Sequence, residues 1–122
     1  MGRIEEFQID GKNFMYIDLS NLKTNEDFEK ELVLIKPRIE KYPEKSLYTI
    51  TNIENVRFDS NSKEVVANYM LHNKPHVRSA AIIGFDGIKK LLVSMIVRLS
   101  GRDEAHFFFS KEQAIEWLLK QD

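Results

Sequence analysis

A chain of 122 residues and 14.3 kDa is the size of one domain, long enough to bury a single hydrophobic core without disulfide or metal support. Its 43% hydrophobic and 30% charged residues are ordinary for a globular protein, and a formal charge of −1 excludes a general electrostatic attraction to nucleic acid or anionic membranes. The absence of cysteine excludes disulfides, thiolate zinc sites and cysteine nucleophiles.

The amino-terminal stretch predicts no targeting signal. MGRIEEFQID has no apolar run typical of a secretion signal, and Glu6 stands where a myristoylation signal needs Ser or Thr. No stretch of the sequence approaches the roughly 20 apolar residues of a membrane-spanning helix. We therefore expect a cytoplasmic protein with no integral membrane segment.

The sequence opens with the pattern of an antiparallel strand pair. Apolar residues cluster at positions 7–9 and 14–19, on either side of Asp10-Gly11. An Asp-Gly dipeptide suits the positive φ angles of a tight hairpin turn. We therefore expect the first two strands to pair about this turn.

A helix is predicted next. Its core face repeats at the spacing of one side of a helix and consists of Phe28, Leu32, Ile35 and Ile39. Thr24 and Asn25 can accept hydrogen bonds from amides of the first turn and so cap this helix. Pro37 lies within the pattern and lacks an N–H group, so we expect a kink or an early end near Lys36.

The middle of the chain predicts a strand, a helix and another strand. Residues 47–51, LYTIT, are β-branched, aromatic or apolar, which indicates a mostly buried strand. The next helical face contains Val65, Val66, Tyr69 and Met70. This helix should stop before Lys74-Pro75, because the residue before proline avoids the α region. Residues 80–85, AAIIGF, then form a continuous apolar strand.

The last third predicts a helix, a strand and a final helix. After a turn at residues 84–87, GFDG, an amphipathic pattern runs to a glycine stop at Ser100-Gly101. Its core stripe is Ile88, Leu91, Leu92, Met95, Ile96 and Leu99. Residues 105–109 have the pattern of a strand. Ser110 and Gln113 then form an S-x-x-Q capping box for a helix that contains Leu118.

Strands and helices alternate after the initial pair. Parallel strands need crossover connections, and helices supply them. We therefore expect one α/β domain over residues 1–122, with a sheet of about five strands, mainly parallel after an antiparallel first strand, and about four helices. The strand order does not follow from the pattern.

The carboxyl edge of such a sheet is the expected place for a ligand, because helix amino termini point unpaired N–H groups outward there. The predicted edge residues are Asn52, Phe58, Gly84, Phe85, Asp86 and Gly87. The GFDG stretch is neither a G-x-G-x-x-G fingerprint nor a P-loop, which favours a plain tight turn over a nucleotide site. Aromatic residues near this edge, including Phe58, Phe85 and residues 107–109, motivate a binder of a small apolar or amphipathic ligand as an alternative function.

The sequence assigns no catalytic residue, cofactor or metal ligand. His72 and His76 are four residues apart, but Pro75 breaks the helix between them. No nucleophile elbow, kinase-like loop or paired-carboxylate motif is present. Basic residues are scattered among acidic ones, which indicates a solvated surface and no nucleic-acid partner.

The stretch RFDSNSKEVVANYM places four cap-forming residues before a helical pattern. These residues are Asp59, Ser60, Asn61 and Ser62. Each has a side-chain oxygen that can accept an N–H bond from the first turn, which stabilises a helix by about 1 kcal/mol. We therefore expect a side-chain cap on a helix that begins near Asn61.

Val93 and Val97 raise a question about self-association. At about 100° per residue they fall opposite the core stripe of the helix predicted for residues 86–100. Isolated exposed apolar residues are common and need no partner. The alternative hypothesis is a weak symmetric homodimer, because one helix turn separates the two valines and a two-fold axis can pair the patch with itself.

The second half of the chain resembles a known family. The stretches AAIIGFDGIKKLL and SGRDEAHFFFSKEQAIEWL, between residues 80 and 118, carry the likeness. Together with the order of elements, they resemble the STAS domain of bacterial anti-sigma-factor antagonists, and more closely a group of small bacterial SpoIIAA-like proteins. The resemblance implies one STAS-like α/β domain and a non-enzymatic interaction or regulatory module with a protein partner.

The same resemblance gives the cap residues a second interpretation. Antagonists of this family bear Asp-Ser-Ser-Gly at the start of the helix after the third strand, where a partner kinase phosphorylates the first serine. Asp59-Ser60 match the first half of that motif, and Asn61-Ser62 depart from it. Phosphate on Ser60 would add a charge of about −1.5 to −2, favoured by the helix dipole and opposed by Asp59. Cap and switch both stay open at this point.

Overall fold

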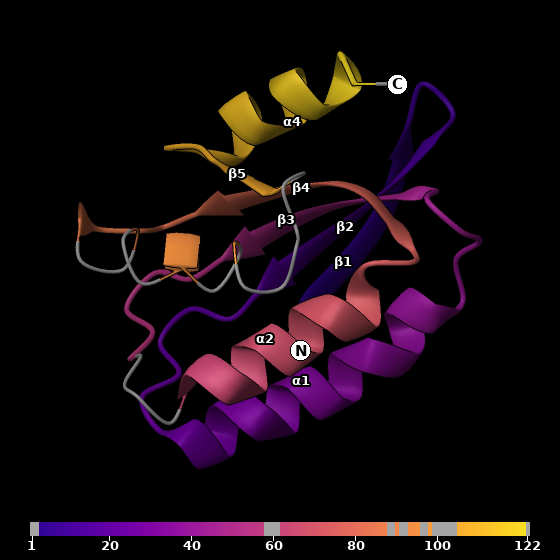
Figure 1. Ribbon diagram of the computed structural model, residues 1–122. Helices are drawn as coiled ribbons and strands as arrows, with labels where there is room; N and C mark the ends of the chain where they lie inside the picture. Colours follow the sequence, from indigo (N-terminus) through magenta and orange to yellow (C-terminus); the bar gives the residue numbers. More distant parts are fainter. Residues whose placement is uncertain are drawn as a thin grey trace.

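The computed structural model contains a five-stranded mixed sheet between two layers of helices (Figure 1). It describes residues 3–57, 62–87, 90, 93–95, 98 and 105–121. The strands are β1 (Ile4–Ile9), β2 (Lys12–Asp18), β3 (Leu47–Asn52), β4 (Val77–Ile83) and β5 (Ala105–Phe107). The helices are α1 (Asn25–Glu40), α2 (Ser62–Asn73) and α4 (Lys111–Leu119), and residues 87, 90, 93–95 and 98 are helical as well.

The strands lie side by side in chain order, β1-β2-β3-β4-β5. β1 pairs antiparallel with β2, whereas each later pair is parallel. Asp10 and Gly11, with φ angles of 53° and 78°, turn the hairpin between Ile9 and Lys12. The predicted α/β fold, with an antiparallel first strand and a mainly parallel sheet, is confirmed.

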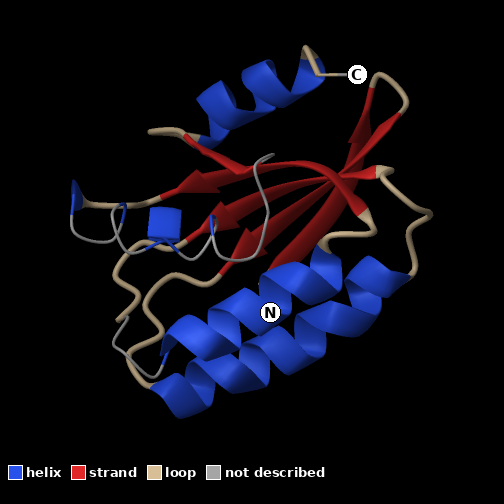
Figure 2. Cartoon of the chain, viewed as in Figure 1, coloured by secondary structure: helices blue, strands red, loops and turns tan. Residues whose placement is uncertain are grey.

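Helices α1 and α2 lie side by side on one face of the sheet, and α4 covers the other (Figure 2). Crossovers between parallel strands are right-handed, so crossovers that all step in one direction across a sheet lie on the same face. This places α1 and α2 together. α4 follows the last strand, is not a crossover, and is free to cover the opposite face.

Each face of the sheet therefore has its own core. On the α1–α2 face, β2 and β3 contribute residues such as Met15, Ile17 and Leu47. On the α4 face, Phe14 and Ile50 pack beneath residues of α4. Residues 47–50 of β3 are buried on both faces, which explains why this strand has no alternation of apolar and polar residues.

Two predicted helix caps are present. Thr24 Oγ1 accepts the N–H of Asp27 at 3.1 Å, and Ser110 Oγ accepts the N–H of Gln113 at 3.1 Å. Gln113 Oε1 in turn accepts the N–H of Phe109 at 3.1 Å. The capping box of α4 therefore also fixes the backbone just before the helix.

The early helix end expected near Lys36 is wrong, because α1 continues through Pro37 to Glu40. Proline removes the hydrogen bond to the carbonyl of Val33. Both Pro37 and Val33 are exposed, so water can solvate that carbonyl. The buried side of the last turn keeps the helix in place through Ile39, which is fully buried.

The boundaries of β4 and β5 also differ from prediction. β4 begins at Val77 instead of residue 80 and ends at Ile83 instead of residue 85. Ser79 was outside the apolar pattern, but it pairs with Tyr48 and is buried, which extends the strand. Gly84 then turns the chain with a φ of 79°. β5 ends at residue 107 instead of residue 109.

One carboxylate ties the edge strand β1 to the end of α1. Glu6 Oε1 accepts a hydrogen bond from the Tyr42 hydroxyl, and Oε2 accepts from Arg38, whose Nε lies at 3.0 Å. The bond from Tyr42 and the charges of Arg38 and Lys41 hold the pKa of Glu6 below its ordinary value, against the opposing effect of burial. Burial and the bond to Glu6 raise the pKa of Tyr42 to about 12.

We predict that Glu6→Gln lowers the free energy of unfolding by about 1–2 kcal/mol, because it removes a charge-assisted bond to Arg38. Denaturant unfolding near neutral pH measures this loss. Glu5→Gln is the matched control. Glu5 forms a surface pair with Lys111 at 3.0 Å, and its side chain is largely exposed, so its replacement should change stability little.

The difference between wild type and Glu6→Gln should depend on pH. A lowered Glu6 pKa means that its stabilisation is full above its ordinary pKa of 4.5 and is lost as pH falls below that value. The raised pKa of Tyr42 means that its stabilisation is full below pH 10.0 and is lost as pH rises toward 12. A stability difference that stays constant from neutral pH into acid would contradict the role assigned to Glu6.

Candidate functional site

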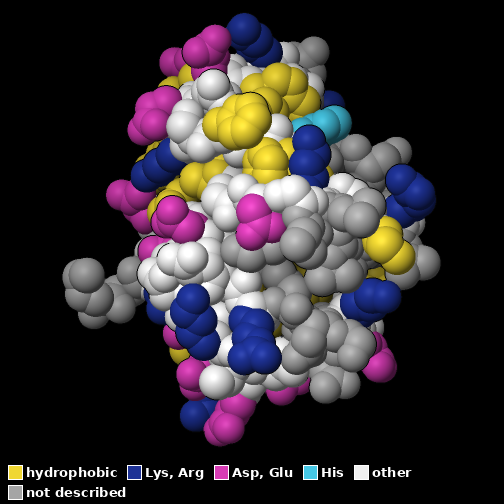
Figure 3. Space-filling model, turned by 90° about the vertical axis from the view of Figure 1, so that its left-hand side faces the viewer, with side chains coloured by type: hydrophobic (Ala, Val, Ile, Leu, Met, Phe, Trp, Pro, Cys, Tyr) yellow, Lys and Arg dark blue, Asp and Glu magenta, His cyan; other side chains and the backbone are white. Residues whose placement is uncertain are grey.

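The parallel strands end at one edge of the sheet, and Figure 3 looks onto this carboxyl edge. Asn52 is the last residue of β3. Gly84, Phe85, Asp86 and Gly87 follow β4 directly. The predicted edge residues that the structure describes are therefore neighbours at the ends of two adjacent strands.

Asn52 links three segments of the chain at this edge. Its Oδ1 accepts the N–H of Glu54 at 3.0 Å, and its amide donates to the hydroxyl of Tyr16 at 3.2 Å. Gly84 lies directly against it with a φ of 79°. A Cβ at residue 84 would stand 2.6 Å from the Glu54 nitrogen and would also meet Asn52 Oδ1. Glycine is therefore needed for both its conformation and the close approach.

The GFDG stretch is the turn between β4 and the helical residues that follow. The carbonyl of Asp86 accepts the N–H of Lys90 at 2.8 Å, so the helical conformation begins directly after Asp86. Gly87 is the first helical residue, and a Cβ there would meet nothing within 4 Å. The turn leaves Phe85 between the strand and the helical residues, along the carboxyl edge.

Three phenylalanine rings gather where β4 and β5 end. The ring centroid of Phe85 lies 5.3 Å from that of Phe107 and 5.6 Å from that of Phe109. Lys90 Nζ lies 5.4 Å from the Phe85 centroid, which is within cation–π range. We call Phe85, Lys90, Phe107 and Phe109 the aromatic cluster. Figure 3 shows hydrophobic side chains gathered in the upper part of this edge.

Phe109 is the exposed member of the aromatic cluster. Its side chain is 85% exposed, whereas Phe85 and Phe107 are half-buried. Phe109 directly precedes the N-cap residue Ser110. An apolar residue at this position often packs onto the fourth residue of the helix, which here is Ala114. The Phe109 ring is too exposed to pack in this way. Because Gln113 holds the backbone of Phe109, the ring projects from a fixed position.

The predicted position of Val93 on a solvent-facing helix side is wrong. Val93 is only 4% exposed and belongs to the core of the α1–α2 face, whereas Met95, predicted in the core, is 43% exposed. Apolar residues fall on nearly every side of the helix predicted for residues 86–100, so the sequence does not determine which side faces the sheet. Burial takes Val93 out of the surface patch from which the homodimer was inferred, and the homodimer itself stays a prediction. Val97 lies outside the described residues.

The cap and switch hypotheses fall at the start of α2. Residues 58–61, which include Phe58, Asp59, Ser60 and Asn61, lie outside the described residues. Ser62 is the first residue of α2, one position from the predicted start near residue 61. The cap and the switch therefore both stay predictions.

The described histidines take part in local contacts. His72 Nε2 lies 2.9 Å from a carboxylate oxygen of Glu40, which joins the ends of α2 and α1. His76 Nδ1 lies 2.9 Å from the carbonyl oxygen of Tyr42. Within the described ranges, no group of three or more His, Asp or Glu is arranged to hold a metal. None of the helices described there is long and apolar enough to cross a bilayer.

Sequence reasoning missed a cavity beneath the carboxyl edge. It has a volume of about 70 Å³, and its walls come from β2, β3, β4, α1 and α2, together with Val93. Thr49 and Thr51 of β3 line it with Tyr69 and Asn73 of α2. The available signal was the spacing of the threonines. Side chains two residues apart in a strand lie on the same face, so two threonines at this spacing place two hydroxyl groups on one face of an otherwise apolar strand.

Two solved structures share this fold. An uncharacterized DUF3478-family protein with a SpoIIAA-like fold, from Shewanella loihica PV-4, has a TM-score of 0.69 and 16% identity, covering 94% of this chain and 91% of its own. An anti-sigma-factor antagonist (STAS) domain protein from Planctomyces limnophilus has a TM-score of 0.59 and 12% identity, covering 94% and 97%. No protein-family model and no curated protein matches the chain. The likeness shows a SpoIIAA-like, STAS-type fold.

We predict that Gly84→Ala lowers the free energy of unfolding by more than about 2 kcal/mol, because it combines backbone strain with a clash against Asn52. Gly87→Ala is the matched control in the same turn. Its Cβ meets open space at a helical position, so it should be neutral or slightly stabilising. Thermal unfolding of both variants checks this, and equal losses would contradict the close approach assigned to residue 84.

Proposed function

We propose that this protein is a non-enzymatic interaction or regulatory module of STAS-like type, which docks a protein partner at its carboxyl edge. The fold supports this class, since one solved structure that shares it is an anti-sigma-factor antagonist domain protein. The observation that carries the proposal is the aromatic cluster, with the ring of Phe109 held out from the surface.

An exposed aromatic ring on a fixed backbone suits a partner-binding role. Aromatic side chains are enriched among the residues that contribute most to protein interfaces. The backbone of Phe109 is already held by Gln113, so docking orders little more than one side chain. Burial of this ring would stabilise a complex by about 1.5–3 kcal/mol. Lys90 adds a positive charge beside the rings and favours a partner with a carboxylate near its apolar residue.

The switch hypothesis for Ser60 is compatible with the same edge. α2 begins at Ser62, and helices that follow strands of a parallel sheet begin at its carboxyl edge. A phosphate on Ser60 would introduce negative charge at the amino end of α2. It would therefore change the electrostatics of the surface on which the proposed partner docks.

The small-ligand alternative has a specific observation in its favour. The cavity beneath the edge is largely apolar, encloses about 70 Å³ and is lined by a few polar side chains. Its residues differ from those of the aromatic cluster. The two functions can therefore be tested separately.

We predict that Phe109→Asp lowers the affinity for the partner at least about tenfold. A tenfold change corresponds to about 1.4 kcal/mol, and burial of the ring contributes more than this to the free energy of binding. The protein is immobilised and exposed to lysate of its native host, and captured proteins are quantified by mass spectrometry. Leu34→Asp is the matched control, since Leu34 on α1 is also 63% exposed but lies outside the cluster.

The two variants should both keep the wild-type melting temperature. A partner that Leu34→Asp loses and Phe109→Asp retains would place the docking surface away from the carboxyl edge. Binding unaffected by either change would also contradict the proposal.

We predict that Ser60→Asp changes the set of captured proteins, because the new carboxylate approximates the charge of a phosphate. Ser60→Ala should preserve the wild-type set, since it adds no charge. Phosphate on Ser60 in protein isolated from the native host, read by intact-mass analysis, provides an independent measurement. Identical captured sets for both variants would count against the switch.

A further inference from the structure

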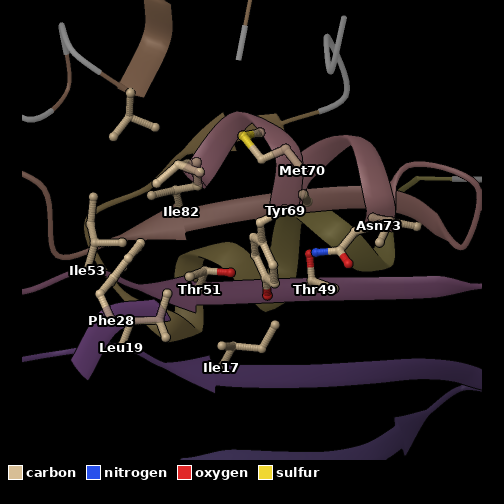
Figure 4. Close-up of a pocket in the computed structure, with 14 residues that line it drawn as sticks. Ile17, Leu19, Phe28, Thr49, Thr51, Ile53, Tyr69, Met70, Asn73 and Ile82 are labelled. Atoms are coloured by element: carbon tan, nitrogen blue, oxygen red, sulfur yellow. The ribbon is translucent and has the colours of Figure 1, made fainter. Parts of the chain in front are cut away.

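The cavity lies between α2 and the sheet (Figure 4). It exists because short side chains line part of the sheet. Thr49 of β3 is paired directly with Ala80 of β4, and both line the cavity. Neither is long enough to fill the space below Tyr69 and Met70 of α2. The cavity encloses about 70 Å³.

The cavity wall divides into a polar and an apolar part. In Figure 4, Thr49 and Asn73 lie together on one side of the space, and Thr51 lies nearer to Phe28. The apolar side chains of Leu19, Phe28 and Ile53 lie together at the other end. An occupant that satisfies both parts must itself be amphipathic.

Thr49 is the most informative polar group. Thr49 is 5% exposed, and its side chain lines the cavity. Buried hydroxyls are rarely left without a partner, because the lost hydration is costly. The Thr49 hydroxyl is therefore placed to bond a guest molecule. Asn73 is also 5% exposed, and its Oδ1 lies 3.0 Å from His72 Nδ1, so it is the Nδ2 group that can donate to a guest.

The charge of the wall limits the occupant. None of the described residues that line the cavity is Lys, Arg, His, Asp or Glu. An ionised group buried there would lose its hydration without gaining a counter-charge, which is far more costly than one hydrogen bond repays. The described part of the wall therefore favours an occupant that is neutral when bound over a carboxylate, phosphate or ammonium group.

The volume of the cavity limits the size of the occupant. One water-sized sphere needs about 10–15 Å³, so the cavity has roughly five to seven such positions. We propose that the cavity is a binding site for a neutral amphipathic molecule of about this size. Its hydroxyl or carbonyl group bonds Thr49 and Asn73, and its apolar part lies against Phe28 and Ile53. This site is separate from the partner-docking edge and does not rest on it.

Two-dimensional amide NMR of the whole chain tests the proposal with three probes of similar size: phenol, benzene and benzoate. Phenol should shift amides of β3 and α2 in a saturable way. Benzene lacks the hydroxyl and should bind roughly threefold to tenfold more weakly. Benzoate is charged and should cause no saturable shift. Failure of phenol to bind, or benzoate binding as well as phenol, would overturn the proposal.

Two variants locate the site. Thr49→Val keeps the shape of the side chain and removes the hydroxyl, so the preference for phenol over benzene should fall, with the Asn73 amide left as the polar partner. Ala80→Ile fills the cavity, so neither probe should bind, while the melting temperature is kept or raised. An undiminished phenol preference in Thr49→Val, or binding that survives Ala80→Ile, would show that the probes bind elsewhere.

Phe109→Asp separates this inference from the proposed partner. It should leave phenol binding unchanged, because Phe109 does not line the cavity. Loss of partner capture with phenol binding intact is the expected result for that variant. Loss of phenol binding in Phe109→Asp would contradict the separation of the two sites.

Discussion

The handedness of parallel crossovers constrains the whole structure. Because β1 to β5 lie in chain order, right-handed crossovers fall on the same face, and α4 is the one helix among the described elements that covers the other face. Two lysines hold this short helix to the hairpin. Lys12 donates to the carbonyl of Leu119 at 2.8 Å, where the last carbonyls of a helix lack partners. Lys111, at the other end, pairs with Glu5 at 3.0 Å. The buried Ala114 and Leu118 attach α4 to the sheet, the Lys12 contact orients the end of the helix, and the exposed Glu5–Lys111 pair adds little stability.

Features that depend on interactions between residues close together in the sequence could be predicted. The Asp10-Gly11 hairpin and the capping box of α4 both follow from local chemistry, and the alternation of elements gives the α/β class. Features decided by distant contacts could not. α1 passes Pro37 because Ile39 is buried against the core and Arg38 is bonded to Glu6 across 32 residues of sequence. The strand order likewise depends on pairings between segments far apart in the chain.

The location of the candidate site was predictable, but its surface was not. The ends of parallel strands meet at one edge in any fold of this class, which brought Asn52 and Gly84 together. Phe107 and Phe109 are two residues apart, so the alternation of a strand predicts that both side chains lie on the same face. They differ in exposure because β5 ends at residue 107. The cavity could not be predicted from the sequence either. It depends on which residue of β4 pairs with Thr49 of β3, and this partner is known only once the register of the two strands is known.

The cavity and the aromatic cluster lie on the same face of the sheet. Phe85 and Phe107 pack against the core of the α1–α2 face, where the cavity lies. Ile82 of β4 lines the cavity and pairs directly with Phe107 of β5. The helical residues after β4 also contact both sites. Val93 lines the cavity, and Lys90, three residues earlier, contacts the Phe85 ring. Such proximity alone does not couple them. A ligand changes the affinity for a partner only if it binds the docked and free forms of the protein unequally. Coupling therefore requires that docking at the aromatic cluster moves Ile82 or Val93; if both stay in place, the two sites act independently.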